Sequence, residues 1–132
     1  MKILPYTVDH VVRDMAKSLA FYRLLGLDIP PELDEESMVE YQASNGFTLT
    51  WSLEAMFVQS GGDKWKDLPG RGRVRLSFHC GSPEGVDETY ARMTTAGYVG
   101  ESAPWDAFWG QRFAQLLDPD GCMIDIFAPL PE

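Results

Sequence analysis

The feature that most constrains this chain is a repeated order of elements, with glycines at matching places. In each half, a run rich in β-branched and aromatic residues predicts a strand, and apolar residues every three or four positions then predict a helix. The helices are expected to end at Gly26 and Gly97, and the later hairpins to turn at Gly46 and Gly121. These pairs are 71 and 75 residues apart, so the chain predicts two similar modules in tandem.

Each module is expected to contain a strand, a helix, a short extended piece and a hairpin. In the first module these are residues 3–12, 15–25, 27–29, 38–43 and 47–53. In the second they are residues 73–80, 83–96 and 98–99, then an aromatic loop and a hairpin around the Asp118-Pro119-Asp120-Gly121 turn. Asp14 and Ser82 are expected to cap the two helices.

The segment between the modules, residues 54–72, contains Gly and Pro but has no apolar period, which favours a linker or a mobile flap. We therefore expect a single α+β domain of two tandem βαβββ modules, residues 1–55 and 73–132, with a linker at 56–72. The helix of each module covers one face of a curved sheet, and the open faces together form a cup.

Charge and hydropathy exclude several classes of partner. The chain has 20 acidic and 11 basic residues and a net charge of −9, which disfavours nucleic acid and anionic membrane surfaces. No apolar run reaches the length of a membrane-spanning helix. The first residues show no signal-peptide pattern, and Cys80 and Cys122 lack metal or redox spacing. We expect a cytoplasmic protein with two reduced cysteines.

Strand alternation predicts which side chains face the open side of each sheet. In the last hairpin these are Phe113, Gln115, Leu117, Met123, Asp125 and Phe127, and in the first hairpin Met38, Glu40, Gln42, Thr48, Thr50 and Ser52. Between the hairpins, Arg75, Ser77 and His79 share the open face, and Val74, Leu76 and Phe78 the core face. A slip of one residue would exchange the two faces.

Two motifs resemble the vicinal oxygen chelate superfamily, which includes glyoxalases, dioxygenases and bleomycin-resistance proteins. Residues 12–27, VRDMAKSLAFYRLLGL, are similar to its first-helix signature, and WGQRF at 109–113 with DPDG at 118–121 resembles its C-terminal signature. The resemblance spans essentially the whole chain. It implies paired βαβββ modules and a homodimer, with strands of two modules closing around each cup.

The resemblance also implies where a divalent metal would bind. The family's enzymes use a residue of each module's first strand and an acid after the last turn, which are Thr7, Arg75 and Asp125 here. A threonine is a poor ligand and an arginine repels a metal, so no metal is expected. The alternative is a set of His10, His79 and Asp125 or Glu40 that binds Fe, Zn or Mn. Alternation places His10 on the helix side, which argues against that set.

Aromatic residues are plentiful, with four tryptophans and seven phenylalanines. Phe57 and Trp65 lie in the linker, and Trp105, Phe108 and Trp109 lie in the loop before the last hairpin. Such side chains at the rim of a cup suit stacking on a flat ligand, and a tryptophan face also accepts a cation. They can equally bury a dimer interface or fill the cup.

We interpret the chain as a bleomycin-resistance-like homodimer that sequesters a small aromatic molecule, such as an antibiotic, without a metal or cofactor. A cationic ligand is left open. The alternatives are a metal-dependent glyoxalase- or dioxygenase-like enzyme and a domain with a collapsed cup that only contacts other proteins. The expected ligand-binding residues are Met38, Glu40, Thr50, Phe57, Trp65, Arg75, His79, Trp105, Phe108, Trp109, Phe113, Gln115 and Asp125.

Overall fold

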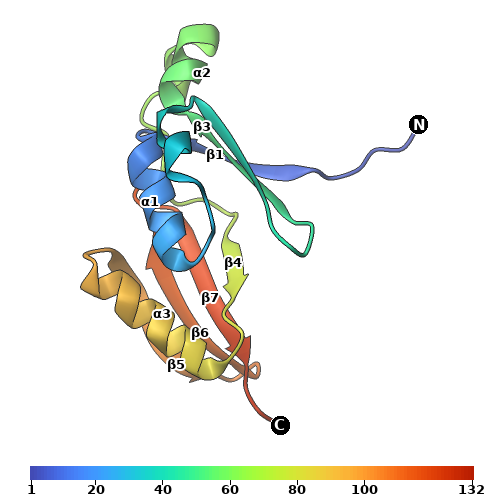
Figure 1. The fold of residues 1–132 in the computed structure, drawn as a ribbon, viewed down its shortest axis with the longest axis vertical. Helices are drawn as coiled ribbons and strands as arrows, with labels where there is room; N and C mark the ends of the chain where they lie inside the picture. The colour runs from blue at the N-terminus through green and yellow to red at the C-terminus, as the bar shows by residue number, and fades with distance from the viewer. The chain divides into compact units, whose positions relative to one another are not determined.

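The computed structural model describes residues 1–132 as three α-helices, two 3-10 helices and seven strands in two sheets (Figure 1). This confirms the expected α+β fold with open sheets. By its contacts the chain separates into two compact units. The first contains residues 1–20 and 28–68, and the second contains residues 21–27 and 69–132. Helix α1 (Met15–Leu25) is therefore divided between them.

The first unit contains a three-stranded sheet in the order β1-β3-β2. Its strands are β1 (Thr7–Val12), β2 (Met38–Gln42) and β3 (Thr48–Leu53), with β1 parallel and β2 antiparallel to β3. The expected alternation is confirmed on β2, where Val39 is buried while Met38 and Glu40 are exposed. On β3 it does not appear as a difference in burial, because Thr48, Thr50 and Ser52 are buried as well as Leu49 and Trp51. As predicted, the Asp14 carboxylate caps α1 by accepting the backbone N–H of Lys17 at 3.0 Å.

Three segments of the first unit differ from the sequence-based expectation. The first strand, expected over residues 3–12, begins only at Thr7. Residues 27–29 form no strand, and η1 (Pro31–Glu35) follows instead. Pro30 and Pro31 lack the N–H groups that a sheet ladder needs. The segment expected to be a linker begins with a helix, α2 (Glu54–Gly61), followed by η2 (Asp63–Trp65). No residue of α2 is buried, so this helix forms without the apolar period that would have revealed it.

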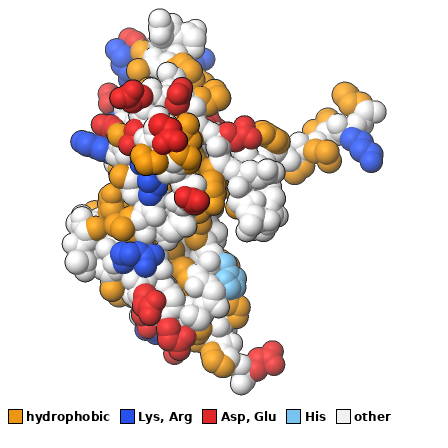
Figure 2. Space-filling view, in the orientation of Figure 1, with side chains coloured by type: hydrophobic (Ala, Val, Ile, Leu, Met, Phe, Trp, Pro, Cys, Tyr) orange, Lys and Arg blue, Asp and Glu red, His pale blue; other side chains and the backbone are white.

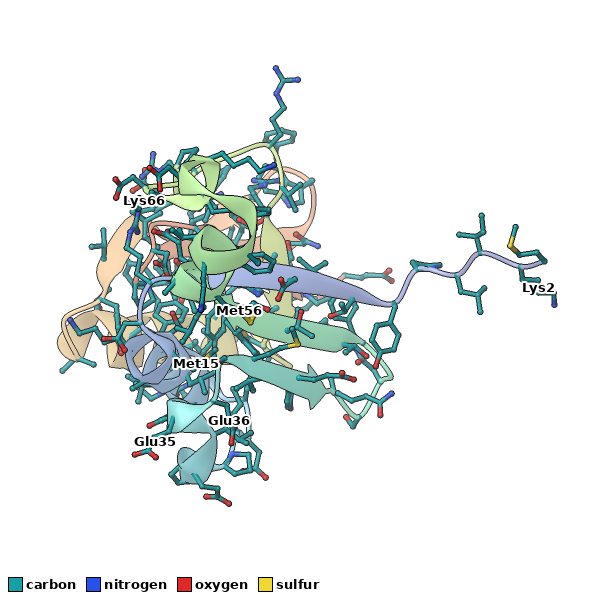
Figure 3. All side chains as sticks on the ribbon, turned by 90° about the horizontal axis from the view of Figure 1, so that it is seen from above. Lys2, Met15, Glu35, Glu36, Met56 and Lys66 are labelled. Carbon is teal, nitrogen blue, oxygen red and sulfur yellow. The ribbon has the colours of Figure 1, made fainter.

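Charged side chains of the first unit lie on its outside. Acidic side chains gather over its helical segments in Figure 2, and Glu35 and Glu36 point outward from η1 and its end in Figure 3. Lys2 lies near the end of an arm that extends beyond β1. No helix is long and apolar enough to cross a membrane.

The second unit contains a four-stranded sheet in the order β4-β7-β6-β5. Its elements are β4 (Leu76–His79), α3 (Pro83–Thr95), β5 (Val99–Ala107), β6 (Gln111–Leu117) and β7 (Met123–Pro129). Helix α3 packs on β5, β6 and β7 and buries Val86 and Met93. Facing residues Leu116, Ile124 and Ile126 are fully buried, as alternation predicted. Ser82 caps α3 by accepting the N–H of Gly85 at 3.0 Å.

Two strands of this sheet begin or end at other residues than expected. Val74, predicted in the core, is 75% exposed because β4 begins only at Leu76. Strand β5 runs to Ala107, although the sequence suggested a two-residue extended piece and a loop. Its pairing with β6 continues through register shifts near Ser102 and Trp105, which an alternation pattern does not predict. Cys80 and Cys122 form no disulfide.

The Asp118 carboxylate organises the turn between β6 and β7. Its Oδ1 accepts the backbone N–H groups of Asp120 and Cys122 at 3.0 and 2.8 Å, and its Oδ2 accepts the Tyr22 hydroxyl at 2.7 Å. Gly121 adopts a φ of 85°, which glycine tolerates without strain. The turn and the end of α1 are thus joined through one carboxylate that is only 5% exposed.

Replacing Tyr22 with Phe is expected to destabilise the protein by about 1–3 kcal/mol, because the buried carboxylate loses its hydroxyl donor. Urea unfolding followed by circular dichroism measures this loss. Tyr98→Phe removes a hydroxyl from another tyrosine of the same unit and serves as the control. Equal effects of the two substitutions would contradict the importance of the Tyr22–Asp118 bond.

The same variant also tests how the stability of the protein depends on pH. Burial and the neighbouring Asp118 raise the pKa of Tyr22 well above its usual value. Above about pH 10 the unfolded chain loses the Tyr22 proton while the folded chain keeps it, so the wild type loses stability as the pH rises. Tyr22→Phe has no hydroxyl proton to lose at this position. The difference in the free energy of unfolding between wild type and variant is therefore expected to become smaller as the pH rises above about 10.

Candidate functional site

A polar row of side chains crosses the open face of the second sheet. Strand pairing places Ser77 of β4 opposite Asp125 of β7, Asp125 opposite Gln115 of β6, and Gln115 opposite Ser102 of β5. These four positions are direct cross-strand neighbours, whose side chains lie within contact distance.

An aromatic row lies next to the polar row. On β4 and β7 it is two residues after the polar row, and on the antiparallel β6 it is two residues before it. It runs from His79 through Phe127 and Phe113 to Trp105. On β5 Trp105 lies three positions after Ser102, and the register shift between them keeps both opposite their β6 partners. From the turn before β6, Trp109 packs edge to face on Phe113 and Trp105, with ring centres 5.3 and 5.4 Å apart.

The Asp125 carboxylate is the most confined charge of this face, being 2% exposed. Its Oδ1 accepts the Gln115 amide N–H at 3.0 Å, and its Oδ2 accepts the Ser77 hydroxyl at 3.0 Å. The Arg75 Nε lies 3.6 Å from the same Oδ2, while the arginine side chain stays 55% exposed. The ion pair expected between Arg75 and Asp125 is therefore present, and both carboxylate oxygens are engaged.

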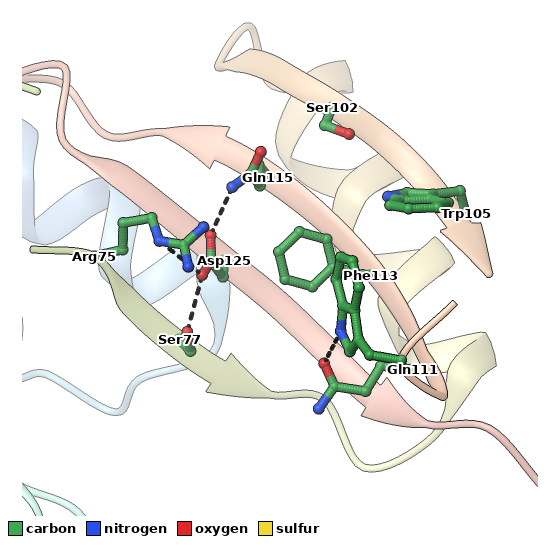
Figure 4. Close-up of a pocket in the computed structure, with 9 residues that line it drawn as sticks. Arg75, Ser77, Ser102, Trp105, Gln111, Phe113, Gln115 and Asp125 are labelled. Atoms are coloured by element: carbon green, nitrogen blue, oxygen red, sulfur yellow. Dashed lines mark hydrogen bonds and ion pairs between the residues drawn. The ribbon is translucent and has the colours of Figure 1, made fainter. Parts of the chain in front are cut away.

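These residues enclose an open cavity of about 450 Å³ (Figure 4). Figure 4 places Arg75, Ser77 and Asp125 at one end, and Trp105 and Gln111 at the other. All lining residues belong to the second unit: Arg75, Ser77, Ser102, Trp105, Trp109, Gln111, Phe113, Gln115 and Asp125. We call this cavity the row pocket.

Six of the residues predicted from the sequence lie together around the row pocket: Arg75, Trp105, Trp109, Phe113, Gln115 and Asp125. Phe108, also predicted, is 91% exposed and does not line the pocket. His79 belongs to the aromatic row but lines a separate cavity of about 250 Å³ beside Cys80. The Nδ1 of His79 accepts the N–H of Gly81 at 2.9 Å.

Three lining residues were not among the predicted binding residues. Ser77 was placed on the correct face by alternation, but Ser102 and Gln111 were missed. Ser102 depends on the β5 register shift. Gln111 accepts the indole N–H of Trp109 at 2.8 Å, and its proximity to this tryptophan in the sequence was an available signal.

The remaining predicted residues belong to the first unit. Phe57 and Trp65 do not lie in an irregular linker, since they come from α2 and η2 and stack on each other with centres 4.6 Å apart. Met38 and Glu40 are exposed on the open face of the first sheet, and Thr50 is buried there at 7% exposure.

The first sheet carries a polar row that corresponds to that of the second. Asp9, Thr50 and Glu40 are cross-strand neighbours on β1, β3 and β2. The Asp9 Oδ1 accepts the hydroxyls of Thr50 and Ser52 at 2.7 and 2.9 Å, and Glu40 accepts the Tyr6 hydroxyl. The acids occupy the outer strands in this row, whereas in the second sheet the acid occupies the central strand.

The residues present do not fit a divalent metal. The Arg75 cation lies beside Asp125 and would repel a metal there. Thr7 donates its hydroxyl to the Thr48 carbonyl at 3.0 Å. His10 is buried on the helix side, stacked on Trp51 at 5.4 Å, which removes it from the alternative set. No three His, Cys, Asp or Glu side chains form a metal-binding group.

Cys80 offers little as a nucleophile. Burial raises the pKa of its thiol, and the thiol rather than the reactive thiolate is therefore favoured. Cys80 lines a cavity together with Phe78, His79 and Ile126.

Comparison with known proteins places this geometry in a family. No curated protein sequence matches the chain. Among solved structures, a hypothetical protein from S. aureus is 22% identical with a TM-score of 0.77, covering 97% of this chain and 94% of its own. A glyoxalase/bleomycin resistance protein/dioxygenase family enzyme from Burkholderia phytofirmans PsJN is 19% identical with a TM-score of 0.78, covering 95% and 98%.

A third structure, a glyoxalase/bleomycin resistance protein from Albidiferax ferrireducens T118, is 22% identical with a TM-score of 0.67, covering 93% of this chain and 96% of its own. Identities at this level show a shared fold alone. The family model described as the Glyoxalase/Bleomycin resistance protein/Dioxygenase superfamily matches residues 6–126. The chain therefore belongs to the glyoxalase/bleomycin resistance protein/dioxygenase superfamily.

Proposed function

We propose that the row pocket binds a small, flat aromatic molecule without a metal ion, and that the protein sequesters this compound instead of transforming it. The observation that carries the proposal is the pairing of an aromatic wall with a carboxylate whose oxygens are already engaged. Trp105, Trp109 and Phe113 supply the wall, and Arg75 with Asp125 occupies the place where the family's enzymes would hold a metal.

The dimensions of the pocket support a small ligand. Pockets for small molecules typically measure about 300–1,000 Å³ and combine aromatic walls with a few polar groups. The row pocket, at about 450 Å³, is within that range. An open cavity also disfavours the alternative in which a collapsed cup serves only protein contacts.

Binding without a chemical reaction agrees with the hydrogen bonds and the ion pair that the polar groups of the pocket already make. Asp125 accepts hydrogen bonds from Gln115 and Ser77 and pairs with Arg75, so its oxygens are not poised to take a proton from a ligand. This supports sequestration over a glyoxalase- or dioxygenase-like reaction. An aromatic antibiotic is one compound of the class that we propose.

A homodimer remains part of the proposal. The first unit exposes Met38, Phe47 and the apolar arm residues Ile3 and Leu4, and a second copy of the chain could cover some of these side chains. Sedimentation equilibrium would show a dimer as twice the 14.8 kDa chain mass, and a single-chain mass at micromolar concentration would contradict it.

Ligand binding is expected to depend on Trp109. A panel of flat aromatic compounds with one to three fused rings, antibiotics included, is titrated against the wild type while its tryptophan fluorescence is followed. For the tightest compound, Trp109→Ala should weaken binding about tenfold by calorimetry, because a stacked aromatic contact contributes roughly 1 kcal/mol beyond its buried area.

Phe108→Ala is the matched control for this variant. Phe108 is adjacent in sequence and packs on Trp109, yet it is 91% exposed and lies outside the pocket lining. Its substitution should leave affinity nearly unchanged. Equal losses in the two variants, or no quenching by any compound of the panel, would argue against an aromatic-binding pocket.

Metal analysis tests whether the protein works without a bound metal ion, as we propose. Protein purified without chelator is expected to carry Fe, Zn and Mn far below one ion per chain. A near-stoichiometric metal that disappears in His79→Ala or Asp125→Ala would favour the metalloenzyme alternative instead.

A further inference from the structure

The row pocket has chemically different ends. Figure 4 shows Arg75, Asp125 and Ser77 at one end and Trp105 at the other, with Phe113 and Gln115 between them. On β6 and β7 the polar and aromatic rows are two residues apart, which corresponds to about 7 Å along a strand. A fused-ring molecule lying on the aromatic row therefore brings a polar substituent to the end that contains Arg75.

At the polar end of the pocket, the Arg75 cation is more accessible to a ligand than the Asp125 carboxylate. Asp125 is 2% exposed, and its two oxygens already accept from Gln115 and Ser77 and pair with Arg75. The Arg75 side chain is 55% exposed, and its Nε lies 3.6 Å from the Asp125 Oδ2. A guanidinium group has five N–H donors in a planar fork, and because the Arg75 side chain is half exposed and lines the pocket, a ligand there can reach some of these donors.

A second donor lies at the other end of the pocket. The Gln111 side-chain oxygen accepts the Trp109 indole N–H at 2.8 Å. This bond uses the oxygen of the amide and leaves its NH₂ group free to donate. The row pocket therefore offers donors at both ends, and a positively charged ligand would have to compete with Arg75 for Asp125.

From this arrangement we propose that the ligand is an aromatic acid, whose carboxylate or similar anionic group binds the Arg75 guanidinium while its rings lie against Trp105, Trp109 and Phe113. The inference rests on the proposed function and specifies the ligand class of the same pocket. It replaces the cationic ligand that the acidic composition left open. In this arrangement Arg75 neutralises Asp125 and still binds the ligand, since the guanidinium fork can engage two carboxylates.

Three probes that share one ring system test the proposal: naphthoate, the neutral naphthamide and the cationic naphthylmethylammonium. Calorimetry of the full-length wild type at pH 7 should give naphthoate an affinity at least about tenfold above that of naphthamide, the usual advantage of a charge-assisted hydrogen bond. The ammonium probe should bind more weakly than naphthamide. This comparison needs no substitution.

Arg75→Gln assigns the preference to one residue. Glutamine removes the positive charge but keeps an amide donor for Asp125, and circular dichroism and thermal unfolding verify the fold. In this variant naphthoate should lose its tenfold advantage while naphthamide binding stays within about twofold. Arg73→Gln is the matched control, because Arg73 is exposed on the same segment, does not line the pocket, and its loss changes the net charge equally.

Arg75→Lys provides a second variant in case the glutamine variant does not fold. Lysine keeps the charge beside Asp125 but lacks the planar fork, so naphthoate binding should fall severalfold with naphthamide unchanged. A preference for naphthoate that is lost in Arg75→Gln, or reduced in Arg75→Lys, and kept in Arg73→Gln supports the proposal.

The contrary outcomes separate this inference from the proposed function. Equal affinities for naphthoate and naphthamide, or a preference for the ammonium probe, overturn the aromatic acid while leaving an aromatic-binding pocket in place. A preference for naphthoate that survives Arg75→Gln overturns the assignment to Arg75. If none of the three probes binds and the wider aromatic panel also fails, the proposed function falls and this inference falls with it.

Discussion

The buried carboxylate of Asp125 is the constraint on which the candidate site depends. An ionised carboxylate removed from water costs several kcal/mol unless charges and hydrogen bonds replace its hydration. Here the replacements come from Ser77 on β4, Gln115 on β6 and Arg75 just before β4. Because side chains alternate with a period of two, the same register that satisfies this acid also brings Phe127 and Phe113 into one row. A register shift on β5 adds Trp105 to that row. The buried charge and the aromatic wall therefore both depend on how the strands of this sheet are aligned.

The two sheets show how a repeated architecture can carry different chemistry. Asp9, Thr50 and Glu40 form a polar row in the first sheet, and Ser77, Asp125 and Gln115 form its counterpart in the second. In the first row the acids lie on outer strands and accept hydroxyl groups. In the second row the acid lies on the central strand, where both neighbouring strands limit its exposure and an arginine balances its charge. The polar and aromatic pocket that we propose for an aromatic acid follows from that change of position.

Family membership and local chemistry answer different questions about this protein. The superfamily match and the shared fold show which architecture the chain adopts. What the pocket can bind depends on the side chains at a few positions, and at one of them a cation stands beside the acid. In our proposal, Arg75 makes this position suit an anionic group instead of a metal ion, although the chain belongs to the superfamily.

The sequence by itself determined the repeat, the caps of α1 and α3, the Asp118 turn, and the faces on which Asp125, Gln115 and Phe113 lie. These features are local, since they follow from residues a few positions apart and from the two-residue period of a strand. Only the tertiary structure decided that Trp105 and Ser102 share a face, because the register shift of β5 depends on its pairing with β6. It also showed that Phe57 and Trp65 stack on each other, and that Phe108 points away from the pocket that Trp109 lines. Neighbouring loop aromatics diverge in this way because the path of a turn, and not its composition, sets which side chain faces inward.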